Sequence, residues 1–170
     1  MIQMTPTLPI DDLLAAVRER WTALGIANHS PASQSDIGAF ESRYGVVLPD
    51  DLRAYFATLN GTALGACGME DEDLLGFWHL DQVHSFAEES SLPTNDPPEA
   101  AHVFVIADHS IWVHAFGVLL SADRQAPAPI VTDVAQPYHQ VAPSFSEFLE
   151  GYLRRDSNMI YPDPKRPGSS

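Results

Sequence analysis

Apolar residues recur at helical spacing in three stretches near the start of the chain. The spacing predicts helices over residues 9–24, 34–44 and 49–59. Gly25 and Gly45 follow the first two stretches, and glycine readily adopts the left-handed conformation that ends a helix. The second and third helices have matched apolar faces that can pack on a flat surface, for which a β-sheet is the obvious candidate.

Capping residues support the second and third of these helices. Ser33 and Asp36 match an N-cap residue followed three positions later by an acid. Pro49 suits the first position of the third helix, because the missing N–H of proline has no partner there in any case. The pair Asn60-Gly61 is expected to end that helix.

The middle of the chain has the composition of strands rather than helices. β-Branched and aromatic residues concentrate in residues 74–80, 102–107, 111–121 and 128–134. The short segment Asp108–Ser110 predicts a hairpin turn between the second and third of these strands. Between the first two strands we expect a short helix within residues 81–90, and then a loop over residues 91–100.

A last helix is predicted over residues 144–155. Ser144 and Glu147 match a capping box, and Arg154 with Arg155 would complement the helix dipole in the last turn. Helices, then strands, then a helix predict an α+β fold: a single antiparallel sheet of about four to six strands, with N-terminal helices and a C-terminal helix packed on it. We expect one domain over residues 1–156 and a flexible tail over residues 157–170, which are rich in proline, serine and glycine.

Charge is the most unusual property of the sequence. The 170 residues include 23 acids and 9 Lys or Arg residues, for a net charge of −14 with neutral histidines. Residues 54–123 contain acids but no Lys or Arg. Such a field repels nucleic acid and anionic membranes and attracts basic proteins. The alternative is that the charge serves solubility alone.

Candidate catalytic residues are few. Cys67 is the single cysteine, and the acids that follow it would raise its pKa and so oppose a nucleophilic role. His79, Asp81 and His84 lie close together in the sequence but match no zinc motif. We therefore expect no catalytic, metal or cofactor site. A small hydrolase or metal enzyme built on these four residues is the weaker alternative.

The sequence also bears on location. No stretch approaches the ~20 apolar residues of a membrane span, and the N-terminal residues carry no basic start or apolar run typical of a secretory signal. The single cysteine excludes a disulfide within the chain. A cytoplasmic protein is expected.

Four segments together resemble one family. They are "SDIGAFESRYGVVLPDDLRAYFATLNG" (35–61), "GFWHLDQVHSF" (76–86), "VFVIADHSIWVHAFGVLLS" (103–121) and "VAPSFSEFLEGYL" (141–153). Their order and spacing resemble the SUKH superfamily, the Smi/Knr-like domain, over residues 33–153. The resemblance implies an α+β fold without catalytic residues or cofactor. It also implies an immunity protein that neutralises a toxin, as in bacterial members, or a regulator, as in fungal members.

These observations predict a non-catalytic protein that binds a cognate toxin with a basic active-site surface, and binds neither nucleic acid nor membrane. An intracellular regulatory or scaffold module is the alternative. The residues expected to bind the partner are Glu70, Asp71, Glu72, Asp73, Glu88 and Glu89, which would form one acidic face.

Overall fold

The N-terminal part of the chain folds into three helices, as the apolar spacing predicts. The computed structural model describes residues 8–62, 71–89, 97–110, 112–135, 138–163 and 165. The helices are α1 (Ile10–Ala23), α2 (Gln34–Tyr44) and α3 (Asp50–Thr58). Each buries one apolar stripe, and α1 buries Leu13, Leu14, Val17 and Trp21.

The predicted caps are largely present. Ser33 accepts the Asp36 N–H and Asp36 accepts the Ser33 N–H, so the capping box is complete. Gly45 ends α2 with φ +65°. Pro49 was expected inside α3 but is its N-cap residue instead, because its ψ of 155° is still extended.

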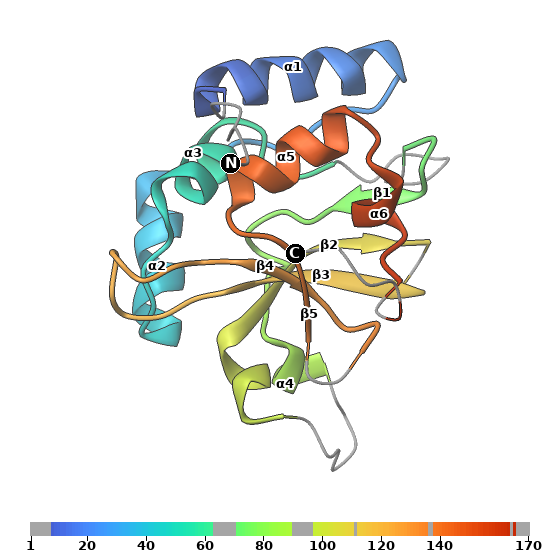
Figure 1. Cartoon of the computed structure of the whole chain (residues 1–170). Helices are drawn as coiled ribbons and strands as arrows, with labels where there is room; N and C mark the ends of the chain where they lie inside the picture. The colour runs from blue at the N-terminus through green and yellow to red at the C-terminus, as the bar shows by residue number, and fades with distance from the viewer. Residues whose placement is uncertain are drawn as a thin grey trace.

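A five-stranded antiparallel sheet forms the middle layer (Figure 1). The strands pair in chain order, each with the next: β1 (Leu75–Phe77), β2 (Val103–His109), β3 (His114–Leu119), β4 (Ile130–Thr132) and β5 (His139–Ala142). The sequence predicted the first four. The turn of the β2–β3 hairpin lies later than expected, because Asp108 and His109 still pair across the ladder.

Both faces of the sheet are covered. One face packs against α1, α2, α3 and α5 (Phe145–Leu153), which together enclose the main hydrophobic core. The other face carries a smaller apolar cluster with Phe86 of α4 (Phe86–Glu89) and Ala100 of the 3-10 helix η1 (Pro98–His102). η1 lies where a loop was expected. Strand β2, which lies between β1 and β3, is therefore buried along its whole length.

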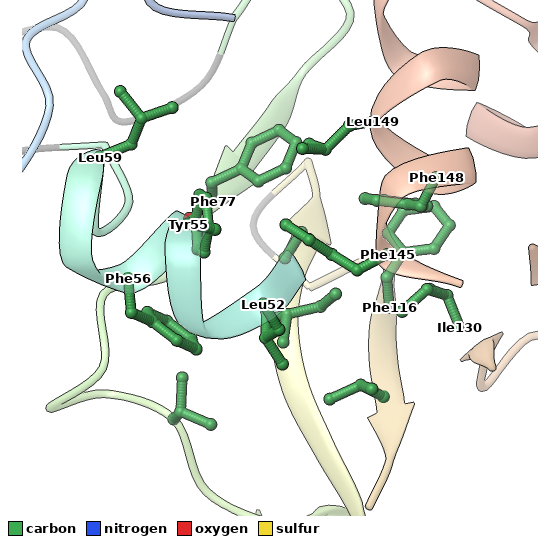
Figure 2. Close-up of a cluster of buried hydrophobic side chains, with 14 of the residues drawn as sticks. Leu52, Tyr55, Phe56, Leu59, Phe77, Phe116, Ile130, Phe145, Phe148 and Leu149 are labelled. Carbon is green, nitrogen blue, oxygen red and sulfur yellow. The ribbon is translucent and has the colours of Figure 1, made fainter. Parts of the chain in front are cut away.

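Aromatic side chains dominate the main core. Figure 2 shows α3, the sheet and α5 converging on it, through Tyr55 and Phe56, Phe77 and Phe116, and Phe145 and Phe148. All six are at most 1% exposed. Most neighbouring rings stand tilted to one another, for example Phe116 and Phe148 with centroids 5.2 Å apart, which is a favourable aromatic geometry.

The C-terminal end departs from prediction in two ways. Arg154 is the C-cap of α5 and Arg155 lies beyond it with φ +55°, so neither is in the last helical turn. Residues 157–160 were predicted to belong to a flexible tail. They instead form α6 (Ser157–Ile160) and bury Met159 and Ile160 in the core. Residues 164 and 166–170 lie outside the described residues. Among the described helices, none combines the length and apolar character needed to span a membrane.

Gly38 offers a simple test of the helix assignment. It lies inside α2, and a Cβ built on it would meet no atom within 4 Å. Gly38→Ala should raise the free energy of unfolding by roughly 0.5–1 kcal/mol, because alanine loses less backbone entropy than glycine on entering a helix. Urea unfolding followed by circular dichroism checks this, and an unchanged or lower stability would argue against a regular α2.

Candidate protein-binding surface

A groove of about 220 Å³ runs between α2 and the turn that follows β1. Two chain segments supply its walls, one from α2 and one from the turn. The lining residues are Asp36, Ala39, Phe40, Arg43, Tyr44, Leu80, Asp81 and Val83.

The lining divides into an apolar floor and a charged rim. Phe40, Leu80 and Val83 are buried and belong to the main core, so the floor is fixed by the fold. Asp36 and Asp81 are exposed. Buried apolar side chains beneath exposed carboxylates form a surface that can bury a carbon chain while meeting a positive charge.

One wall of the groove is joined to α4 through Glu88. The Tyr44 hydroxyl donates to Glu88 Oε1 at 3.3 Å, and Arg43 Nη2 lies 3.8 Å from the same oxygen. Glu88 Oε2 accepts the Ser85 N–H at 2.9 Å. Burial opposes ionisation of Glu88, but the hydrogen bonds from Ser85 and Tyr44 outweigh it and lower the pKa of Glu88. Glu88 is thus an ionised group at the edge of the groove.

Glu89, the next residue of α4, pairs with a histidine. Its carboxylate contacts His84 Nε2, while His84 Nδ1 donates to the carbonyl of Gln82 at 2.7 Å. Glu88 and Glu89 are each partly exposed at the side chain. Both predicted residues therefore lie on the surface, held by contacts within their own part of the fold.

Asp71, Glu72 and Asp73 form a different kind of site. Asp73 accepts bonds from Arg20 at 2.9 Å and from Arg155 at 2.7 Å, and Asp71 Oδ1 accepts the Asp73 and Leu75 N–H groups. The Asp71 side chain is 1% exposed. Hydrogen bonds from Arg155 and then Arg20 lower the pKa of Asp73, against the effect of burial. These carboxylates hold α1, β1 and the end of α5 together.

The acids that were expected on one face therefore lie in two separate parts of the structure. Glu88 and Glu89 lie on α4, at the lower end of Figure 1, and the Asp71–Asp73 cluster contacts Arg20 of α1, at the upper end. Glu70 lies outside the described residues. Partner binding by these residues stays a prediction, but Asp71 and Asp73 are already paired with arginines of this chain.

Residues 54–123 contain no Lys or Arg, but in the folded structure arginines from other parts of the chain lie against them. Arg20, Arg43 and Arg155 come from outside residues 54–123 and contact acids within it. Tertiary folding therefore neutralises part of the charge that the sequence places there, and it leaves exposed acids elsewhere, including Asp36 and Asp81.

The residues of the enzyme alternative do not converge. His79 stacks on His29 with ring centroids 4.1 Å apart, and burial followed by the charge of His29 lowers the pKa of His79. His84 instead contacts Glu89. Within the described part of the chain, no three His, Cys, Asp or Glu residues are placed to share a metal ion. Cys67 lies outside the described residues.

A second histidine pair gives a prediction on pH. His114 is buried, stacks on His109 at 4.7 Å and donates from Nε2 to the Ile160 carbonyl at 3.0 Å. Burial and then His109 lower its pKa, and they outweigh the opposing effects of that hydrogen bond, Asp133 and Asp108. His114 is therefore neutral in the folded state where the unfolded chain already binds a proton.

Stability should consequently fall as the pH drops through the ordinary histidine pKa of about 6.5, by at most about 1.4 kcal/mol per pH unit for this proton. His114→Gln keeps a donor for the Ile160 carbonyl but does not titrate, so its unfolding free energy should depend less on pH between 7 and 5. His139→Gln, at a partly exposed residue of edge strand β5, is the control. An identical pH dependence of all three proteins would contradict the assignment.

The groove itself was missed by sequence reasoning. Asp36 was identified only as a capping residue, and Asp81 only as a possible metal ligand. One signal was available: Asp36, Ala39, Phe40, Arg43 and Tyr44 are spaced to share one helix face. The opposite wall comes from residues 80–83, and nothing in the sequence places that turn beside α2.

Comparison with known protein families identifies the family to which the chain is similar. The model of the SMI1/KNR4 family (SUKH-1) matches residues 31–151. This range contains both walls of the groove, all five strands and most of α5. No curated protein matches the chain.

Proposed function

The chain belongs to the SMI1/KNR4 family (SUKH-1), and from this premise we propose that it is a non-catalytic protein-binding domain that neutralises a cognate bacterial toxin by binding it. The partner is a protein with a basic active-site surface. The proposal extends the family assignment, which supports the type of domain, to a specific role.

The observation that carries the proposal is the exposed acidity left after internal pairing. Among the described residues, six arginines form ion pairs with acids of this chain: Arg20, Arg43, Arg53, Arg124, Arg154 and Arg155. Exposed carboxylates such as Asp12, Glu19, Asp36 and Asp81 have no ion pair with any residue in the described ranges. The surplus negative charge therefore faces solvent, where it acts on approaching molecules.

A toxin that acts on nucleic acid must hold phosphates in a basic cleft. An acidic protein that occupies this cleft excludes the substrate by charge and by volume, without making or breaking a covalent bond. Complementary charge also accelerates encounter. The association rate constant should therefore be high at low salt and fall roughly tenfold or more when salt screens the charges.

Co-expression tests the proposal. The chain is produced in cells together with the toxin encoded beside its gene, and growth and complex formation are measured. The proposal predicts restored growth and a complex that survives purification at low salt. Growth arrest with no complex would reject it.

The regulatory alternative gives a different result in the same experiment. A regulatory module would leave the neighbouring toxin active and would instead retain a cellular protein. The absence of any toxin gene beside this one would also favour that alternative.

A further inference from the structure

We propose that the groove between α2 and the β1–α4 turn receives an arginine or lysine side chain of the partner protein. The identity of that partner as a toxin rests on the proposed function, whereas the preference of the groove for a cationic side chain follows from the residues that line it.

The size and floor of the groove suit a long, flexible side chain. Its volume of about 220 Å³ is that of one large side chain rather than a helix or a folded segment. Phe40, Leu80 and Val83 provide an apolar floor against which the methylene groups of arginine or lysine can pack. Such side chains bury their stems while their charged ends remain near polar groups.

The rim provides free negative charge. The Asp81 carboxylate is exposed and forms no hydrogen bond or ion pair with any described residue, although its charge acts on nearby His79. Asp36 uses Oδ2 to accept from the Ser33 N–H and hydroxyl, at 2.8 and 2.6 Å, which leaves Oδ1 available. Carboxylates with unoccupied oxygens favour a guanidinium, because its planar donors match their geometry.

Arg43 does not cancel this charge. Its guanidinium lies over the Tyr44 ring, 5.0 Å from the centroid, and beside Glu88. The basic residue of the groove therefore has its own carboxylate, and Asp36 with Asp81 remain in excess.

The Asp71–Asp73 cluster is a poorer receptor for the same cation. Arg20 and Arg155 already occupy the Asp73 oxygens, and Asp71 is buried beneath them. A partner arginine would have to displace an internal one there. The groove offers its carboxylates without such competition.

Two variants test the groove in binding to the neighbouring toxin. Asp81→Asn removes the charge at nearly constant volume, and Ala39→Arg, at an exposed position of α2, fills the groove with a cation of this chain. Each should weaken binding about tenfold or more, as loss of a central contact does. Glu19→Gln removes one exposed carboxylate of α1 outside the groove and should change the dissociation constant less than about twofold.

A small probe separates this inference from the proposed function. N-acetyl-arginine amide is titrated into isotope-labelled chain, with N-acetyl-norleucine amide as the uncharged control. Amide shifts confined to residues 36–44 and 80–83, reduced in Asp81→Asn, would support the groove even if no toxin bound. If toxin binds but tolerates Asp81→Asn and Ala39→Arg, the groove assignment is wrong while the function stands. If the probe shifts none of these residues, the inference is overturned.

Discussion

Replacing Arg20 by methionine is expected to lower the free energy of unfolding by about 3–5 kcal/mol, because it leaves buried carboxylates without their cation. The Arg20 side chain is only 13% exposed and lies within 3.6 Å of Asp71, Glu72 and Asp73. It also donates to the Tyr152 carbonyl at 2.8 Å and covers the Tyr152 ring. Equilibrium unfolding in urea measures the loss.

The buried position of the acids is the reason for so large an effect. The Asp71 and Asp73 side chains are 1% and 10% exposed, so water cannot replace the guanidinium. Arg155 compensates Asp73 in part, through Nη2 at 2.7 Å. Asp71, which lies deepest, would lose its charge partner.

Arg124→Met is the matched control. Arg124 pairs with Asp50 at 2.9 Å, but the two side chains are 53% and 86% exposed. Water screens such a pair, so this variant should lose less than about 1 kcal/mol. Equal losses for Arg20→Met and Arg124→Met would show that the Arg20 network is solvated, contrary to the structure.

Gly61→Ala should lower the free energy of unfolding by a comparable amount, roughly 2–5 kcal/mol, for steric reasons. Gly61 has φ +79°, and a Cβ built on it would lie 2.6 Å from His79 N and Trp78 C and 2.8 Å from Phe77 O. All three are backbone atoms of β1 and its turn, which cannot rotate away. The methyl group would therefore push the end of α3 off the sheet.

Gly25→Ala isolates the steric contribution. Gly25 has nearly the same φ, +72°, but a Cβ there would meet no atom within 4 Å. This variant should carry only the conformational cost of about 1–2 kcal/mol. Thermal unfolding of the two proteins compares them, and similar losses would mean that Gly61 does not approach the β1 backbone.

Local patterns explain why the helices could be predicted from the sequence. The apolar spacing, the Ser33 cap and Gly45 together predict α2, and all of them lie within or next to the helix. β5 and α6 lacked such signals. His139–Ala142 has only four residues and begins with two polar ones, and Ser157–Ile160 is a single helical turn whose apolar pair, Met159-Ile160, was the only indication of burial.

The candidate binding surface was less accessible to prediction because charge depends on tertiary contacts. Asp71 and Asp81 are equivalent in the sequence, as acids in a segment without bases. In the structure Arg20 contacts Asp71, whereas Asp81 remains exposed on the groove. Which acids remain available to a partner is decided by residues more than fifty positions away.

The central claim is that this chain acts by occupying another protein, without chemistry. Titrating the activity of the neighbouring toxin with the purified chain tests it most directly. We expect activity to fall in proportion to the amount added, to reach zero near one molecule of chain per molecule of toxin, and to return when high salt dissociates the complex. Complete inactivation by a small fraction of an equivalent, with no recovery, would instead reveal a catalyst and contradict the account.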